Sequence, residues 1–173
     1  LLAQEIVAIL WGARWADSGP ILQVLALWAA ARALGNPVGS LTLGTGRADL
    51  SLKWNLAMLL LMPPAIWFGA THGPTGLSIS MLALTAGMFL PMWKFLVAPL
   101  SGAGLGEYAR AALTPVVIAL LAAVPFHFLK AGLEVSSGAA LSLGLSYVII
   151  YLLLSWCFNR SWLKSLLELV HGA

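Results

Sequence analysis

Five uninterrupted apolar stretches dominate the pattern of hydrophobic and polar positions along the chain. They run over residues 21–44, 52–70, 76–99, 109–129 and 135–158. A helix of about 20 apolar residues is long enough to cross the hydrocarbon core of a bilayer. The stretches are continuous and do not alternate apolar with polar residues, which favours helices over barrel strands. The sequence therefore predicts an all-α, polytopic transmembrane helix bundle with about five spanning helices.

The composition agrees with this pattern and excludes a water-soluble domain. The chain is 61% hydrophobic and 9% charged, with a mean hydropathy of +0.94. A soluble globular domain carries about a quarter charged residues. The net charge of +3 then reports where the loops lie relative to the membrane. We expect the lipid bilayer as a partner and no nucleic acid.

The two ends of the chain differ from the five apolar stretches. The run Leu1–Trp11 is too short to span a bilayer and carries Glu5. We interpret it as the end of a helix that begins upstream, in a piece of a longer protein, with a surface-lying first helix as the alternative. Residues 159–173 place apolar and charged residues on opposite helical faces. This predicts an amphipathic helix in the membrane interface, with packing against another protein surface as the alternative.

The basic residues are distributed unevenly between the two sides of the predicted bundle. With five spans, six cations fall in or beside the loops and the tail on one side, and two on the other. The two sets are Arg47, Lys53, Lys94, Arg110, Arg160 and Lys164, against Arg14 and Lys130. Cytoplasmic loops carry an excess of Lys and Arg. The larger set, and with it the C-terminus, is therefore predicted to be cytoplasmic.

Arg32 is the one charged residue inside the first apolar stretch. A charged side chain near a span centre costs about 2.5–3.5 kcal/mol on insertion scales, so it needs a partner or water. One hypothesis is that Arg32 lines a cavity and binds an anionic substrate, since a guanidinium suits phosphate. Asn36, four residues on, would extend this polar strip. The alternative is a structural bond to another helix.

The most patterned polar stretch is the segment that joins the first two predicted spans. Its candidate residues are Gly46, Arg47, Asp49, Lys53 and Asn55. The plain interpretation is a cytoplasmic loop with charges at the interface. Asn55, just inside the second span, is less usual there and would cap or bridge helices.

Residues that support catalysis or metal binding are scarce in this sequence. Cys157 is the single cysteine, and His72, His127 and His171 lie far apart in the chain. No acidic residue accompanies a histidine at the spacing of metal ligands, and no hydrolase or nucleotide-binding motif occurs. We therefore expect no metal site, no cofactor and no enzymatic activity.

Three segments follow one another in an order that resembles a known family. They are Glu5–Ala26, with Arg14-Trp15-Ala16-Asp17 inside it, Gly46-Arg47-Ala48-Asp49-Leu50 leading to Asn55, and Gly73-Pro74-Thr75-Gly76-Leu77. Together they resemble the C-terminal half of polysaccharide-type lipid-linked oligosaccharide flippases. This family shares a superfamily with the MATE drug exporters and the lipid II flippase. The resemblance covers about residues 5–100.

The resemblance implies transport without chemistry on the substrate. Two lobes would rock around a central cavity and turn a polyprenyl-pyrophosphate-linked oligosaccharide across the bacterial inner membrane. In that fold, residues 1–100 would supply the end of one helix and three spans of the C-terminal lobe. Residues 101–158 would supply two additional terminal helices, and residues 159–173 a cytoplasmic tail. The N-terminal lobe of the same protein would be missing from this chain.

Two other classes of protein remain open at this point. One is a non-catalytic integral membrane subunit, for which a start codon directly before Leu1 would be the discriminating observation. The other, which the short and sparsely polar loops disfavour, is a membrane-embedded lipid or glycosyl transferase.

Overall fold

The computed structural model describes residues 2–131 and 137–158, and every regular element within them is helical. This confirms the prediction of an all-α protein. The elements in chain order are α1 (Ala3–Trp11), η1 (Ala13–Ser18), α2 (Gly19–Ala33), α3 (Asn36–Gly44), α4 (Ala48–Ala70), α5 (Gly73–Gly87), α6 (Phe89–Met92), the π-helical segment η2 (Trp93–Val97), α7 (Ala98–Ser101), α8 (Leu105–Ala131) and α9 (Ser137–Phe158). The amphipathic segment predicted over 159–173 lies outside the described residues.

Three helical stretches within the described residues are long and apolar enough to cross a membrane. They are Arg14–Gly44, Gly73–Ser101 and Leu105–Phe126, and they cover the first, third and fourth predicted spans. Helix α4 is long, but Asp49, Lys53 and Asn55 make its first half polar. The side chains described in α9 form a shorter apolar helix. Spanning by α4 and α9 therefore stays a prediction.

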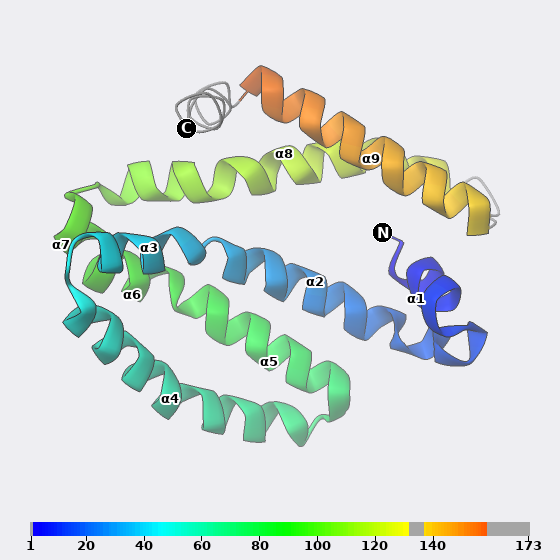
Figure 1. The fold of residues 1–173 in the computed structure, drawn as a ribbon. Coiled ribbons are helices and arrows are strands. Elements are labelled where there is room, and N and C mark those ends of the chain that lie inside the picture. The colour runs from blue at the N-terminus through cyan, green and yellow to red at the C-terminus, as the bar shows by residue number, and fades with distance from the viewer. Residues whose placement is uncertain (1, 132–136, 159–173) are drawn as a thin grey trace.

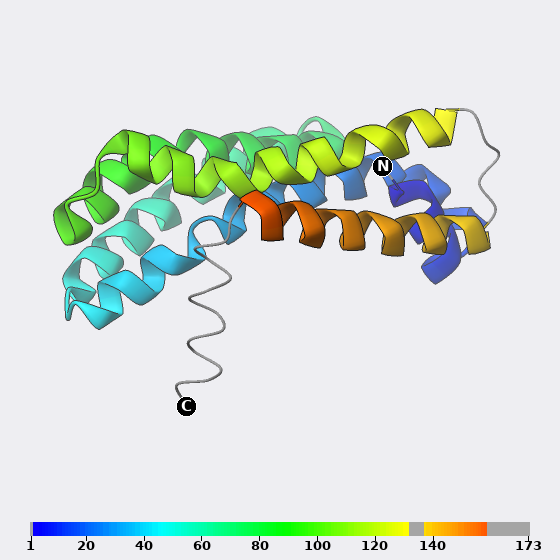
Figure 2. The same cartoon turned by 90° about the horizontal axis from the view of Figure 1, so that it is seen from above.

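The helices form a layer of three beside a hairpin of two (Figure 1). Helices α2, α5 and α4 lie next to one another, and α8 with α9 forms the hairpin. The view from above again shows α8 and α9 side by side (Figure 2). Tyr147 of α9 donates a hydrogen bond of 3.2 Å to the carbonyl of Ala119 and packs edge-on against Phe126. These contacts link the antiparallel helices of the hairpin.

Helices α4 and α5 approach each other closely because two glycines lie at their contact. A Cβ atom on Gly69 would lie 2.7 Å from the Cβ of Ser80 and 2.8 Å from the Cα of Leu77. Gly76 is crowded in the same way by Gly69 and His72. Ser80 also donates a 2.5 Å hydrogen bond to the carbonyl of Ala65. Small residues let membrane helices pack backbone to backbone in this way.

Two of the apolar stretches are interrupted, and a proline explains each interruption. A proline lacks the N–H that a helix needs and its ring clashes with the carbonyl four residues earlier. Pro37 stands four residues after Ala33, where α2 ends, and Pro91 four residues after Gly87, where α5 ends. The sequence predicted each stretch as one span, and the structure divides both into segments.

The two interruptions lie at the same level of the bundle. Trp28 of α2 donates a 3.0 Å hydrogen bond to Thr85 of α5, a pair separated by 57 residues. Gly35 and Met92 are separated by the same number, and a Cβ on Gly35 would lie 3.2 Å from the Met92 methyl carbon. Helices α2 and α5 therefore run parallel and in register, and their breaks lie beside each other.

Prolines do not interrupt the other helices. Pro63 and Pro64 lie inside the continuous helix α4, and Pro115 and Pro125 inside α8. The prolines of the long helices therefore fall into two groups. Pro37 and Pro91 follow the ends of α2 and α5, whereas α4 and α8 continue through their prolines.

A small hydrophobic core holds together the end of the molecule where α3 turns into α4 and α7 into α8. Its buried residues are Val38, Leu96 and Val97, from α3 and η2. The partly buried side chains packed around them are Leu50, Trp54, Met92, Trp93, Ala103 and Tyr108. Phe89 stacks on Tyr108 with ring centroids 4.7 Å apart. This cluster joins four helical segments and the start of α8.

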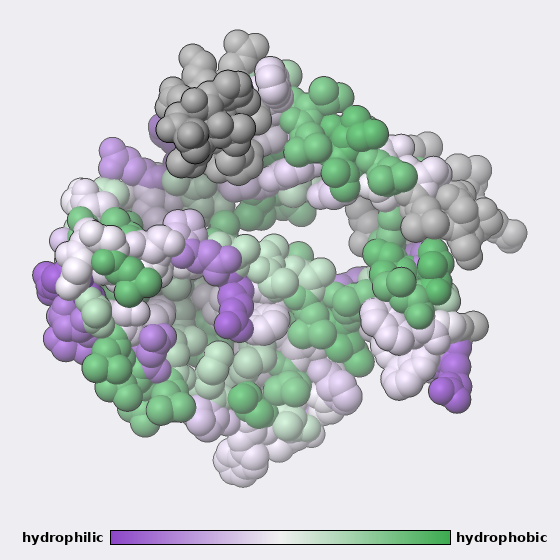
Figure 3. Space-filling model, in the orientation of Figure 1, coloured by the Kyte–Doolittle hydropathy of each residue, from purple (hydrophilic) through white to green (hydrophobic). Residues whose placement is uncertain are grey.

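Most of the apolar surface remains uncovered by this chain. Only 6%, 11% and 22% of the residues in the three long apolar windows are buried. Leu60 and Trp67 of α4 are exposed by 75% and 77%, and apolar residues cover much of the visible face (Figure 3). Apolar surface of this extent is unfavourable in water. Lipid or further protein must therefore cover it.

Candidate functional site

Arg32 lies in the last turn of α2, directly before the first interruption. Its guanidinium carbon is 5.4 Å from the centre of the Trp28 ring, in a cation–π arrangement. The side chain is exposed, and the structure shows it no ion pair within residues 2–131 and 137–158. A cation in the last turn is also favoured by the negative end of the helix dipole.

These contacts reduce the cost of the charge without removing it. A desolvated cation–π contact is worth about 2 kcal/mol, against about 2.5–3.5 kcal/mol for arginine at a span centre. The remainder requires water or an anion that the described residues of this chain do not supply. The guanidinium N–H groups of Arg32 are thus available to donate hydrogen bonds, as binding of an anionic substrate would require.

Asn36 lies on the other side of the interruption, as the first residue of α3. The sequence prediction placed it on one helical face with Arg32, which assumes an unbroken helix. The turn Leu34–Gly35 separates the two residues, so they occupy successive helical segments. Both side chains are exposed. Their joint role in substrate binding stays a prediction.

Gly46 owes its place in the polar loop to backbone geometry. It has φ +69°, in the left-handed region that glycine adopts without strain. The N–H of Gly46 bonds to the carbonyl of Leu43 at 3.0 Å, and that of Arg47 to the carbonyl of Thr42 at 2.9 Å. These two bonds form a Schellman motif that closes α3. The structure therefore gives Gly46 a structural role.

Arg47, Asp49 and Lys53 form a charge cluster at the start of α4. Arg47 Nε donates to Asp49 Oδ1 at 3.0 Å, and Lys53 Nζ lies 3.7 Å from Asp49 Oδ2. The hydrogen bond from Arg47 holds the pKa of Asp49 below its ordinary range, and the same bond raises the pKa of Arg47. A carboxylate in the first turn also suits the positive end of the helix dipole. Asn55, two residues after Lys53 in α4, is exposed.

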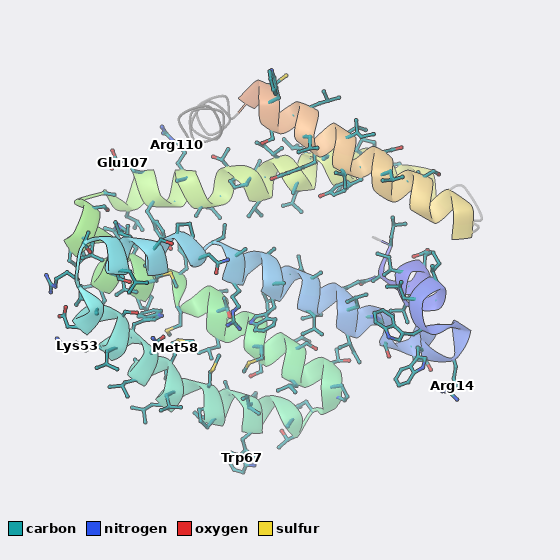
Figure 4. All side chains as sticks on the ribbon, viewed as in Figure 1. Arg14, Lys53, Met58, Trp67, Glu107 and Arg110 are labelled. Carbon is teal, nitrogen blue, oxygen red and sulfur yellow. The ribbon has the colours of Figure 1, made fainter. Side chains whose placement is uncertain are left out.

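Two cations of the predicted cytoplasmic set lie at the same end of the molecule. Lys53 and Arg110 lie at the end of the molecule where α3 meets α4 and α7 meets α8, whereas Arg14 lies at the opposite end (Figure 4). This distribution agrees with the separation that the loop charges predicted. The side of the membrane that each end faces stays a prediction.

The sequence analysis missed Trp28 and Thr85. Trp28 lies within α2, and its ring faces the guanidinium of Arg32. The Thr85 hydroxyl accepts the Trp28 indole N–H at 3.0 Å and donates to the Met81 carbonyl at 2.9 Å. The spacing of four between Trp28 and Arg32 was a visible signal. No feature of the sequence indicated that Thr85 on α5 is the hydrogen-bond partner of Trp28.

Two shallow hollows lie away from Arg32. One, of about 420 Å³, lies between α1 and the start of α2 and is lined by Glu5 and Asp17, among others. The other, of about 480 Å³, follows one face of α8 from Ala109 to Leu121. No group of three His, Cys, Asp or Glu residues within the described part of the chain is arranged to hold a metal ion.

The long apolar helices, their exposed faces and the charges gathered at the ends define a helical membrane protein. The chain is similar to three curated proteins. It is 28% identical over 118 residues to an uncharacterized membrane protein in the cps region of Klebsiella pneumoniae. It is 26% identical over 121 residues to the lipopolysaccharide biosynthesis protein WzxC of Escherichia coli K12, and 27% identical over 117 residues to the teichuronic acid biosynthesis protein TuaB of Bacillus subtilis 168.

These matches confirm the predicted resemblance to membrane proteins of bacterial surface-polysaccharide biosynthesis. They cover 68% to 69% of this chain but only 24% to 25% of the relatives. The chain therefore spans about a quarter of the length of the relatives it matches. No family model matches the chain, and no solved structure matches it.

Proposed function

We propose that this chain is part of a flippase that moves polyprenyl-pyrophosphate-linked oligosaccharides across the bacterial inner membrane for surface-polysaccharide biosynthesis. Its similarity to WzxC and TuaB over two thirds of its length is the observation that carries the proposal. The apolar helices and the scarcity of catalytic groups support transport and not a chemical step. The remaining three quarters of such a protein would supply the N-terminal lobe and complete the pathway.

Arg32 would act as a ligand of the pyrophosphate in this pathway. Its side chain is exposed, its guanidinium lies against the Trp28 ring, and residues 2–131 and 137–158 offer it no ion pair, so its N–H groups can donate to an anion. A guanidinium donates two parallel hydrogen bonds to phosphate oxygens, which lysine does not reproduce. Asn36, at the start of α3, would add a neutral donor to the same ligand. No residue of the chain is assigned a covalent step.

The test is to replace Arg32 by Ala and by Lys in the full-length protein and to measure surface polysaccharide at matched expression. Loss of the guanidinium is expected to reduce export by about tenfold or more, since charge-assisted hydrogen bonds are worth about 1.5–3 kcal/mol. Arg32→Lys is expected to restore export only in part. Unchanged export in both variants would remove Arg32 from the pathway.

A further inference from the structure

We propose that Trp28, held by Thr85 of α5, is a positioning residue that fixes the direction of the Arg32 guanidinium. The inference rests on the proposed function, because it assumes that Arg32 binds the anionic part of the substrate. It adds a specific link from a second helix to that residue. Neither Trp28 nor Thr85 would touch the substrate.

The link consists of two contacts in series. The guanidinium of Arg32 lies against the ring of Trp28, with 5.4 Å between the guanidinium carbon and the ring centre. The indole N–H of Trp28 donates to Thr85 Oγ1 at 3.0 Å. An arginine side chain has many rotamers, whereas a tryptophan has two side-chain torsions. A tryptophan fixed at its N–H therefore gives the guanidinium a defined surface to lie on.

The Thr85 hydroxyl is suited to this role because both of its functions are used. It donates to the Met81 carbonyl at 2.9 Å, which leaves its lone pairs directed away from its own helix. One of these lone pairs accepts the indole N–H. In an apolar environment an indole N–H without a partner is unfavourable. The hydrogen bond therefore favours one orientation of the Trp28 ring.

The position of this link in the bundle connects Arg32 to α5. Trp28 and Thr85 lie about two turns before the contact of Gly35 with Met92, where the interruptions of both apolar stretches lie side by side. A movement of α5 relative to α2 would break the hydrogen bond and release the ring. The direction of the guanidinium would then depend on how the two helices are placed.

The experiment measures binding of farnesyl pyrophosphate to the detergent-purified full-length protein by calorimetry, with farnesol as the uncharged control. The variants are Thr85→Val, Thr85→Ser and Trp28→Phe. Thr85→Val keeps the shape and removes the acceptor, and Trp28→Phe keeps a ring and removes the donor. Thr114→Val is a matched control, because the Thr114 hydroxyl donates within its own helix, to the carbonyl of Arg110.

Thr85→Val and Trp28→Phe are expected to weaken farnesyl pyrophosphate binding by about fivefold, as the loss of one hydrogen bond implies. Thr85→Ser and Thr114→Val are expected to stay within about twofold of the unaltered protein. In an Arg32→Ala background, Thr85→Val is expected to have no further effect, because the residue that it positions is gone. A purely structural role of Thr85 would weaken binding in both backgrounds and overturn the inference.

Two further outcomes separate this inference from the proposed function. If Arg32→Ala weakens binding and export while Thr85→Val and Trp28→Phe behave like the unaltered protein, the positioning role is wrong and the proposed function stands. If Arg32→Ala itself binds farnesyl pyrophosphate and exports normally, Arg32 is no ligand and both assignments are wrong.

Discussion

At the residue scale, the guanidinium of Arg32 lies against the ring of Trp28, whose indole N–H donates to Thr85 of another helix. Arg32 is conspicuous as a charge in an apolar stretch, and Gly46 and Asp49 as parts of a polar turn. Their local roles follow from short-range chemistry that the order of residues determines. Thr85 contacts Trp28 across 57 residues, and no local pattern encodes such a pair. The candidate site could therefore be predicted only for the part that lies on one helix.

Gly46 provides a test at this scale. Replacing it by Ala is expected to destabilise the full-length protein by about 1–2 kcal/mol, because φ +69° is strained for a residue with a Cβ. The measurement is the midpoint of thermal unfolding in detergent. Gly39→Ala is the control, since Gly39 lies inside helix α3 and a Cβ there meets nothing within 4 Å. Equal stability of Gly46→Ala and Gly39→Ala would contradict the Schellman assignment.

At the element scale, apolar run length predicted where helices lie but not where they break. Prolines occur in all of the long helices except α9 within the described residues. Pro37 and Pro91 follow the ends of α2 and α5 by four residues. The breaks of α2 and α5 have a distinct environment, because they lie against each other at Gly35 and Met92. Tertiary contacts of this kind are absent from a sequence pattern.

Pro37→Ala tests the cause of the first break. The variant regains an N–H that can donate to the carbonyl of Ala33, so α2 and α3 are expected to join into one helix. Hydrogen exchange of peptides covering residues 33–41 should slow by about tenfold or more, as an amide enters a helical hydrogen bond. Pro115→Ala, inside the continuous helix α8, serves as the control with little change in neighbouring peptides. Unaltered exchange around residue 37 would show that the break has another origin.

At the scale of the whole molecule, the class of protein followed from hydropathy alone, whereas the arrangement did not. The sequence predicted a bundle, but nothing in it indicated that α2 and α5 run parallel and in register. The charge count predicted one end rich in cations and one end poor in them. Lys53 and Arg110 lie at one end of the molecule and Arg14 at the other (Figure 4). Loop charges allow a prediction at this scale because cytoplasmic loops carry an excess of Lys and Arg.

The orientation can be measured in cells that express a cysteine-free full-length protein. Single cysteines are placed at Arg47 and at His72, which lie at the two ends of α4. A membrane-impermeant maleimide added from outside is expected to label the cysteine at 72 and to spare the one at 47 until the cells are broken. The reverse labelling would place the cationic end outside and refute the predicted orientation.

The alignment of the two interrupted helices has a mechanical consequence. When two parallel helices are broken at the same level, both can bend there without one helix sliding along the other. Pro37 and Pro91 follow the breaks at the ends of α2 and α5. The core around Val38 and Leu96 joins the helical segments that come after these breaks. If α2 and α5 bend at these breaks, we expect the segments beyond Pro37 and Pro91 to move together, because they share that core.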